Sequence, residues 1–368
     1  MVSRRRFITA GVVAGVGAAA GAAWMADRAA KDAYAEALQN TWRPLDVRGT
    51  EHLARMRELV RMATLAPSSH NTQCWRFAIG ARAITLRPDF SRRCPAVDPD
   101  DHHLFVSLGC AAENLVQSAA AMGFRATPMF DAATGAIEVA LAPAEARPSA
   151  LVDAIPLRQS TRAAFDGRPL PSEALSRLRE VSEGDGVNVV LLTERRAMES
   201  VLDFVVRGNT TQMRDPAFVR ELKHWLRFNG AQAAATGDGL FAASSGNPTA
   251  PAWLGSRLFD QFFTEQAEND KYARHIRSSA GIAVFVSERD DRAHWVAAGR
   301  AFQRFALQAT ALGIRNAHLN QPIEVASLRP EFTRLVGATS GRPDLVIRFG
   351  RGPEMPRSLR RPVDAVLA

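Results

Sequence analysis

The stretch APSSHNTQCWRF, residues 66–77, joins a polar turn directly to a run of aromatic and apolar residues. Pro67 fixes its own φ and disfavours the helical region for Ala66, so the apolar helical spacing before it is expected to end here. The polar residues that follow are typical of a turn, and residues 75–79 (WRFAI) are typical of a strand. The stretch therefore predicts a helix, a tight turn and a strand in immediate succession.

The side-chain amides of Asn71 and Gln73 stand two residues apart in this turn. Each amide both donates and accepts hydrogen bonds, and the pair suits the pyrimidine edge of a flavin ring. For so short a motif, a plain polar loop between a helix and a strand is the alternative. The rest of the chain has to decide between the two.

Composition bounds the possible classes of protein. The chain has 368 residues, of which 46% are hydrophobic, so it can bury one large core or two modest ones. The formal net charge is +8, but the arginines alternate with acidic residues and lack interleaved aromatic residues, so we expect no nucleic-acid surface. The spacing of Cys74, Cys94 and Cys110 fits neither a zinc motif nor a dense disulfide framework, and it leaves open whether one pair oxidises.

The N-terminus has the form of a twin-arginine export signal, which we assign to residues 1–26. SRRRFI, residues 3–8, precedes an apolar run rich in Gly and Ala. The run is weakly apolar and, at about 17 residues, short for an ordinary membrane span. We expect export by the twin-arginine machinery to the periplasm or another extracytoplasmic site, with membrane anchoring if the signal is not cleaved. Because this route carries folded proteins, it suits one that binds its cofactor before export.

After a charged helical linker, residues 27–48, helices and short strands alternate as in an α+β protein. A hairpin is expected from residues 75–79 and 83–86, with Gly80 in the turn. A helix is expected from His102 to Met122, closed by Gly123. Its N-cap is expected among the acidic residues Asp98, Asp100 and Asp101.

An internal similarity suggests that the fold is duplicated. Residues 109–123 align without gaps on residues 299–313, at a constant offset of 190, and each segment ends in Gly before a strand-like run. Chance similarity between two Ala-rich helices is the alternative. Duplication predicts two half-domains around a pseudo-twofold axis, residues 49–150 and residues 151–368, the second with a lid-like insertion.

Two motifs carry a resemblance to a known family. The first is residues 67–75, PSSHNTQCW, similar to Pro-Ser-x-x-Asn-x-Gln-Pro-Trp except that Cys74 replaces Pro. The second is residues 158–165, RQSTRAAF, similar to Arg-x-Ser-x-Arg-x-Phe. Both belong to the nitroreductase-like FMN proteins, whose ordinary members are homodimers with the flavin between subunits. In those members the arginine motif precedes the Pro-Ser motif, whereas here it follows.

The reversed order implies one composite site. The first half has no arginine motif before Pro67, and the second half has no Pro-Ser motif near residue 257. If the halves pack like the two subunits of the family dimer, one FMN site is complete and its symmetry mate is lost. The arrangement resembles the Acg branch, whose members are fused pseudo-dimers. The resemblance thus implies an α+β nitroreductase-like fold, two fused half-domains forming an intramolecular pseudo-dimer, and one FMN per chain.

The resemblance also implies which residues bind FMN. Asn71 and Gln73 would face the ring, the arginine motif would serve the phosphate and ribityl oxygens, and the backbone of residues 316–320 would pass beside flavin N5. We assign no catalytic side chain and no metal ligand. The predicted cofactor-binding residues are Pro67, Ser68, Ser69, Asn71, Gln73, Arg158, Ser160, Arg162, Ala317, His318, Arg360 and Arg361.

Two functions remain open. The first is an FMN-dependent, nitroreductase-like oxidoreductase that passes a hydride or electrons through flavin N5 to a small acceptor of the nitroaromatic or quinone type. The second is a flavoprotein that sequesters FMN and turns over little, with Gly237, Asp238 and Gly239 in a flexible cover. A hydrolase built on Ser69 and His70 is unfavoured because neighbours in a chain seldom form a nucleophile–base pair. DPDDHH, residues 98–103, is explained by helix capping rather than by metal binding.

Overall fold

The computed structural model of the chain describes residues 31–338 and 341–368. The predicted export signal, residues 1–26, lies outside the described residues. Of the predicted linker, residues 31–41 form a helix, as expected from its charged pattern.

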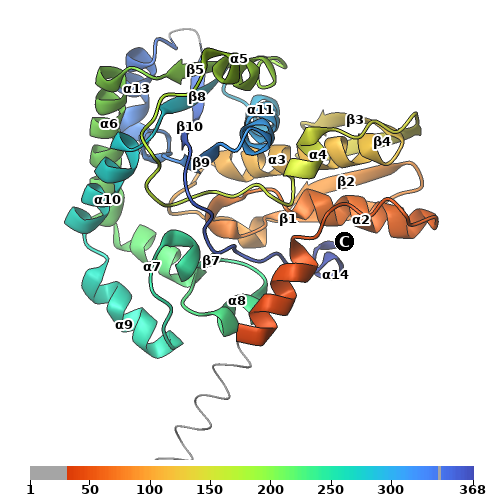
Figure 1. The fold of residues 1–368 in the computed structure, drawn as a ribbon, viewed down its shortest axis with the longest axis horizontal. Coiled ribbons are helices and arrows are strands. Elements are labelled where there is room, and N and C mark those ends of the chain that lie inside the picture. Colours follow the sequence, from red (N-terminus) through yellow and green to blue (C-terminus); the bar gives the residue numbers. More distant parts are fainter. Residues whose placement is uncertain (1–30, 339–340) are drawn as a thin grey trace, which may run out of the picture.

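The first half of the chain builds an antiparallel four-stranded sheet in the order β1-β2-β4-β3 (Figure 1). The predicted hairpin is confirmed, because Trp75–Ile79 pairs antiparallel with the next strand. The helix before Pro67 ends at Thr64, as the proline predicts. The elements of this half are α2 (His52–Thr64), η1 (Ser69–Asn71), β1 (Trp75–Ile79), β2 (Ala83–Pro88), η2 (Phe90–Arg92), α3 (His102–Ala121), β3 (Phe124–Asp131) and β4 (Ala136–Pro143).

Helix α3 starts at the predicted residue, and Asp98 is the aspartate that caps it. The two carboxylate oxygens of Asp98 accept hydrogen bonds from the backbone N–H groups of His103 and Leu104, both at 3.0 Å. Asp101 precedes the helix directly but makes no side-chain cap. The helix ends one residue earlier than predicted, and Gly123 follows with a φ of +79°.

The second half builds another antiparallel four-stranded sheet, in the order β5-β8-β10-β9. Its main elements are α4 (Ala150–Ala154), α5 (Ser172–Glu180), β5 (Val187–Leu192), β8 (Gly281–Ser287), α11 (Arg292–Ala311), β9 (Arg315–His318), α12 (Gln321–Glu324), η4 (Ala326–Leu328), α13 (Arg329–Leu335), β10 (Arg342–Gly350) and α14 (Val363–Val366).

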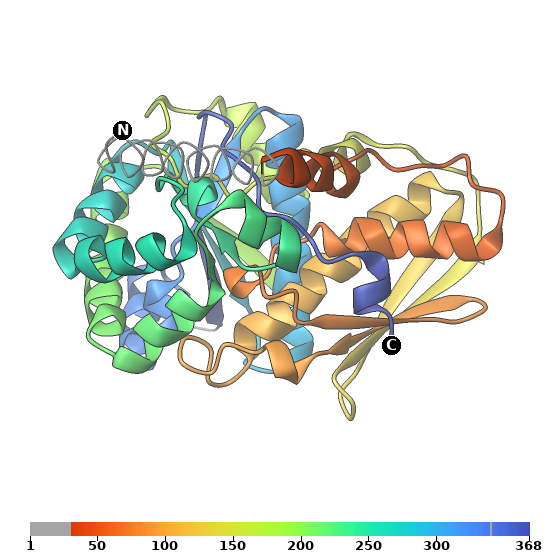
Figure 2. The same cartoon turned by 90° about the horizontal axis from the view of Figure 1, so that it is seen from below.

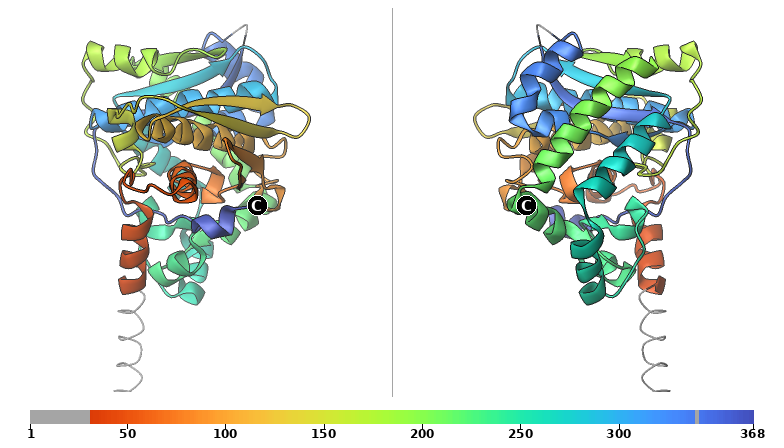
Figure 3. Two further views of the ribbon diagram at one scale, coloured as in Figure 1. Left: turned by 90° about the vertical axis from the view of Figure 1, so that its right-hand side faces the viewer. Right: turned by 90° about the vertical axis from the view of Figure 1, so that its left-hand side faces the viewer.

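A helical insertion separates β5 from β8. Its first and last helices, α6 and α10, cover one face of the second sheet, and α11 covers the other (Figure 3). The helices between them extend past the edge of the sheet (Figure 1). The insertion contains α6 (Arg195–Met213), α7 (Pro216–Trp225), β6 (Leu226–Arg227), α8 (Gly230–Thr236), β7 (Leu240–Phe241), η3 (Ala242–Ser245), α9 (Ala252–Phe262) and α10 (Glu265–Arg277).

The two halves have the same topology. Strands β1, β2, β3 and β4 correspond to β5, β8, β9 and β10, and the strand order across each sheet is the same under this correspondence. The long helix lies after the second strand in both halves, as α3 in one and α11 in the other. This equivalence supports the internal duplication inferred from the 190-residue offset. That the halves stand for the two subunits of a family dimer remains a prediction.

Helices α3 and α11 pack against each other between the two sheets, and two glycines allow their close approach. A Cβ atom placed on Gly109 would lie 2.1 Å from the carbonyl oxygen of Val296, and one on Gly299 would lie 2.0 Å from that of Val106. The two contacts are related by the same 190-residue offset, so each helix presents the same surface to the other. Backbone thus meets backbone at the centre of the molecule.

Among the described helices, α3 alone is long and apolar enough to cross a membrane, and 78% of its apolar window is buried in the protein. Its apolar character is therefore that of a core helix.

The final segment of the chain returns from the second half to the first (Figure 2). It leaves β10 after Gly350, and its end lies against strand β1, where the N–H of Ala368 donates to the carbonyl oxygen of Phe77 at 2.8 Å. Its arginines are thereby placed close to the Pro67 turn.

We predict that Gly109→Ala and Gly299→Ala each lower the free energy of unfolding by about 1–3 kcal/mol or more, because a methyl group would meet a carbonyl oxygen that belongs to rigid helix backbone. Urea denaturation measures the effect. Gly49→Ala is the matched control, since the nearest atom to its added Cβ is 4.0 Å away. Unchanged urea midpoints in both helix variants would contradict the packing described here.

Candidate functional site

The turn after Pro67 holds three residues other than glycine in the left-handed region. The φ values of His70, Asn71 and Gln73 are 47°, 54° and 55°. Such conformations are strained and persist only where the surroundings fix them. Ser68 helps to do so, because its Oγ accepts a hydrogen bond from the N–H of Gln73 at 2.9 Å. The turn is thus held rigidly.

Asn71 ties this turn to two distant segments. Its Nδ2 donates to the carbonyl oxygens of Gly239 at 2.9 Å and Leu359 at 3.1 Å, and the N–H of Gly239 donates back to the Asn71 carbonyl at 3.1 Å. The Oδ1 of Asn71 is buried and has no hydrogen-bond partner among the described residues. The side-chain oxygen of Asn71 can therefore accept a hydrogen bond from a ligand.

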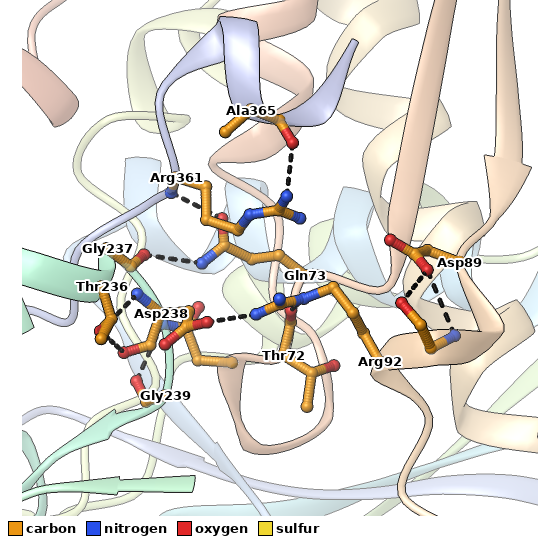
Figure 4. A network of polar contacts seen from close by, with 12 residues as sticks. Thr72, Gln73, Asp89, Arg92, Thr236, Gly237, Asp238, Gly239, Arg361 and Ala365 are labelled. Carbon is orange, nitrogen blue, oxygen red and sulfur yellow. Dashed lines mark hydrogen bonds and ion pairs between the residues drawn. The ribbon is translucent and has the colours of Figure 1, made fainter. Parts of the chain in front are cut away.

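Gln73 does not occupy the place that the sequence predicts for it. Its side chain is fully buried, and its Nε2 donates to the carbonyl of Gly237 at 2.8 Å (Figure 4). Its Oε1 accepts from the N–H of Arg361 at 2.8 Å. Both ends of the amide are used by backbone groups, and Gln73 lines neither of the cavities described below. Its position is that of an anchor for two segments that border the site.

A second anchor centres on Asp238, which is 9% exposed. Its carboxylate pairs with Arg92 of the first half (Figure 4). It also pairs with Arg227 of the insertion, at 2.6 Å. The flanking Gly237 and Gly239 have positive φ values and lie against backbone carbonyls. The sequence predicts a flexible cover here, but the structure shows a segment tied down by ion pairs and close backbone contacts.

The predicted arginine motif runs beside strand β9. The N–H of Thr161 donates to the carbonyl oxygen of Asn316 at 2.8 Å, and Ser160 forms a parallel bridge with Asn316. The buried Arg348 of β10 fixes the motif further, because it donates to the carbonyls of Thr161 and Ala163 at 2.9 and 2.8 Å. The arginine motif and strand β9, which the resemblance assigns to one flavin site, are therefore neighbours.

A cavity of about 270 Å³, here called the large cavity, lies where the Pro67 turn, β9 and the insertion meet. The insertion contributes an aromatic side that the sequence did not predict, formed by Phe218, Phe259, Phe263 and Tyr272. His70 lines the cavity, but its Nε2 has no hydrogen-bond partner among the described residues, so no Ser69–His70 catalytic pair forms. The predicted residues that line the cavity are Pro67, Ser68, Ser69, Arg162, Ala317 and His318.

His318 is a packed imidazole in this structure. Its ring meets that of Phe302 edge to face, with 4.9 Å between centroids. Burial, with the positive charge of Arg162, lowers the pKa of His318 to about 3, so the ring is neutral near pH 7. A neutral ring of this kind is a poor proton donor, and we assign no catalytic role to it.

A smaller pocket of about 70 Å³, here called the basic pocket, shares Pro67, Ser68 and Arg162 with the large cavity. Trp42 and Arg357 are among the residues of its wall that the sequence did not predict. The Trp42 ring lies 4.9 Å from the guanidinium carbons of both Arg357 and Arg360. The predicted residues that line it are Pro67, Ser68, Asn71, Arg158, Ser160, Arg162 and Arg360.

Arg357 of the basic pocket pairs with Glu354 at 3.1 Å, but within the described part of the chain Arg158 and Arg360 form no ion pair with a carboxylate. Arg158 is 3% exposed, and its Nε and Nη1 have no partner among the described residues. The guanidinium bonds of Arg158 and Arg360 go to carbonyls of residues 64–66 and 359. Burial, together with the charge of Arg357, lowers the pKa of Arg158 to about 10. Buried cations without counter-ions call for an anion, and a phosphate group fits this donor set.

Arg361 does not line either cavity. Its guanidinium donates to the carbonyl of Ala365, and its N–H bonds to Gln73. Of the two adjacent arginines, only Arg360 lines the basic pocket. Arg361 therefore positions the segment.

A comparison with family models finds no match. A comparison with curated proteins finds two relatives from Mycobacterium tuberculosis strain H37Rv that carry the provisional name NAD(P)H nitroreductase. One is 27% identical over 324 residues, which cover 85% of this chain and 90% of that protein. The other, Acg, is 24% identical over 328 residues, which cover 84% of this chain and 94% of that protein. The chain resembles these nitroreductases. The predicted resemblance to this family and its Acg branch is confirmed over most of the sequence.

Solved nitroreductase structures match more distantly. A nitroreductase with bound FMN from Bacteroides fragilis is 13% identical and covers 57% of this chain and 94% of its own, with a TM-score of 0.36. The FMN-dependent nitroreductase NfnB from Mycobacterium smegmatis, in complex with NADPH, is 14% identical and covers 56% of this chain and 93% of its own, also with a TM-score of 0.36.

We predict that Asp238→Asn lowers the free energy of unfolding at pH 7 by about 3 kcal/mol or more, because two largely buried arginines lose their shared partner. Although burial opposes it, hydrogen bonding to Arg227 and Arg92 lowers the pKa of Asp238 below its usual 3.8. A lowered pKa means that this stabilisation is complete above the usual aspartate range and is lost as the pH falls through the lowered value.

Urea denaturation of wild type and variant between pH 7 and pH 3 measures the difference. Asp46→Asn is the control, since Asp46 pairs with Arg48 at the surface, where ion pairs contribute little to stability. A difference between wild type and Asp238→Asn that has already disappeared at pH 5 would argue against this ion-pair anchor.

Proposed function

We propose that this protein binds one FMN per chain between its two halves and acts as a nitroreductase-like oxidoreductase. The observation that carries the proposal is the buried Arg158 with the partly buried Arg162 and Arg360, which form no ion pair with a carboxylate of the described residues and line the basic pocket beside the large cavity. The names of the curated relatives support the same activity. A ligand with an anionic end and a flat ring suits two adjoining spaces of this kind.

In this proposal Arg158, Ser160, Arg357 and Arg360 bind the phosphate end, and Arg162 lies where the two spaces join. The ring end occupies the large cavity, near the backbone of Ala317 and His318. Bound FMN supplies hydride and electron transfer. The chain supplies fixed cations, backbone amides and an aromatic wall that excludes water.

FMN sequestration with little turnover is the second candidate, and the anchoring of the insertion favours it. Gln73, Asn71 and Asp238 bind the cover segment to the first half, so the access of a second substrate would require these contacts to open. Export by the twin-arginine route is part of both proposals, whereas a small-molecule electron donor and acceptor belong to the oxidoreductase alone.

We predict that replacing Arg158 and Arg162 together by Ala reduces FMN retention at least tenfold, because both guanidinium groups line the basic pocket. The visible absorbance of bound flavin per chain, followed through dialysis, measures retention. Arg87→Ala is the matched control, since Arg87 is exposed on strand β2. An unchanged flavin content in the double variant would refute the proposed phosphate site.

We expect the purified protein to be yellow, and stopped-flow mixing with NADH or NADPH separates the two candidates. Bleaching of the flavin band, followed by its recovery on adding a nitroaromatic compound or a quinone, is the result expected of the oxidoreductase. A yellow protein that neither nicotinamide reduces favours sequestration. A colourless protein that does not take up added FMN contradicts both candidates.

A further inference from the structure

Three groups with metal-binding atoms converge beside the large cavity from separate parts of the chain. They are the imidazole of His70 in η1, the thiol of Cys94 in the loop after η2, and the carboxylate of Glu221 in α7. One nitrogen, sulfur or oxygen atom of each lies within 4.8 Å of the corresponding atoms of the other two. Neither flavin motif accounts for this convergence.

The imidazole is neutral and has a free position. The Nε2 of His70 is buried and has no hydrogen-bond partner among the described residues. Burial, with the positive charges of Arg162 and His103, lowers the pKa of His70 to about 4. A neutral imidazole is the form that binds a metal ion. The left-handed φ of 47° at His70 is strained, and strain of this kind is common at functional sites.

The carboxylate is held in place but lacks a cation. The oxygens of Glu221 accept hydrogen bonds from the N–H groups of Ala96 at 2.9 Å and Val97 at 3.1 Å. Within the described part of the chain, no arginine, lysine or histidine forms an ion pair with Glu221. Two backbone amides therefore fix the orientation of a carboxylate whose remaining lone pairs are available.

The thiol of Cys94 lies near the acidic side chains of Glu221 and Asp98. Cys94 is 3% exposed and forms no disulfide. Burial raises the pKa of both Cys94 and Glu221, and the negative charge of Asp98 adds to both shifts. A bound cation would reverse both shifts, since it favours the thiolate and the carboxylate.

We propose that His70, Cys94 and Glu221 bind a zinc ion whose fourth coordination position opens to the large cavity. A set of nitrogen, sulfur and oxygen ligands suits zinc, whereas magnesium and calcium prefer oxygen alone. His70 itself lines the cavity, together with the nearby Val97 and Phe218, so water or a ligand in the cavity can supply the fourth donor. The zinc site adjoins the cavity proposed for the flavin ring but uses none of the residues proposed to bind FMN, and it goes beyond the proposed function.

Zinc would also link three separate segments of the chain. It would connect the strained Pro67 turn, the loop before α3 and helix α7 of the insertion. A ligand that binds only the folded chain stabilises it in proportion to the logarithm of its free concentration. Zinc should therefore raise the melting temperature of the intact protein.

The experiment uses the full chain as purified, stripped of metal by a chelator and titrated with Zn²⁺ alone against a chromophoric competitor. One zinc per chain is expected, with affinity at least tenfold weaker in Cys94→Ser and in Glu221→Gln. Cys110→Ser is the matched control, because its thiol is buried like that of Cys94 but donates to the carbonyl of Gly299 at 3.2 Å. Co²⁺ should give a thiolate charge-transfer band in the wild type and the control, and none in Cys94→Ser.

Zinc binding well below one per chain in the wild type, or undiminished in both ligand variants, overturns the proposal. Circular dichroism melts of each variant without metal check that it folds, and Glu221→Gln keeps the size of the side chain. Flavin content is recorded in the same preparations. Loss of zinc with flavin retained, or the reverse, shows which of the two sites fails.

Discussion

The packing of α3 against α11 is the constraint on which the rest of the structure depends. Gly109 and Gly299 let the backbone of each helix reach the carbonyl groups of the other. Each helix also packs on its own sheet, so the distance between the two helices fixes the distance between the halves. The large cavity is lined by both helices, through Val106 and Phe302 among others, and its width follows from the same contact.

Much of this arrangement could be predicted because its signals are local or periodic. Pro67 ends a helix, Gly80 turns a hairpin, and the 190-residue offset indicates the duplication that the sheet order supports. The Pro67 turn and the arginine motif do meet, as the complementary motifs suggested. At these positions the local conformational preferences of the sequence agree with the folded structure.

The partners of individual side chains could not be predicted in the same way. Gln73 and Arg361 fit the motifs, yet each bonds to the other's segment rather than facing a cavity. Trp42 was not predicted to line the site, because it follows a helix whose charged pattern indicates only a linker. The role of such a side chain depends on which distant segments pack against it. Gly237, whose carbonyl accepts a hydrogen bond from Gln73, lies more than 160 positions from it in the sequence.

The contact between the two long helices is close to symmetric in shape but not in charge. Glu113 of α3 is buried and pairs with Arg300 and Arg304 of α11, at 3.1 and 3.2 Å, whereas Gln303 holds the position equivalent to Glu113. Two copies of α3 brought together would bury two carboxylates without these arginines, and two copies of α11 would leave each Arg304 without an acid and each Arg300 with Asp185 alone. The charge pattern thus makes each helix select the other within its own chain and discourages exchange of halves between neighbouring molecules.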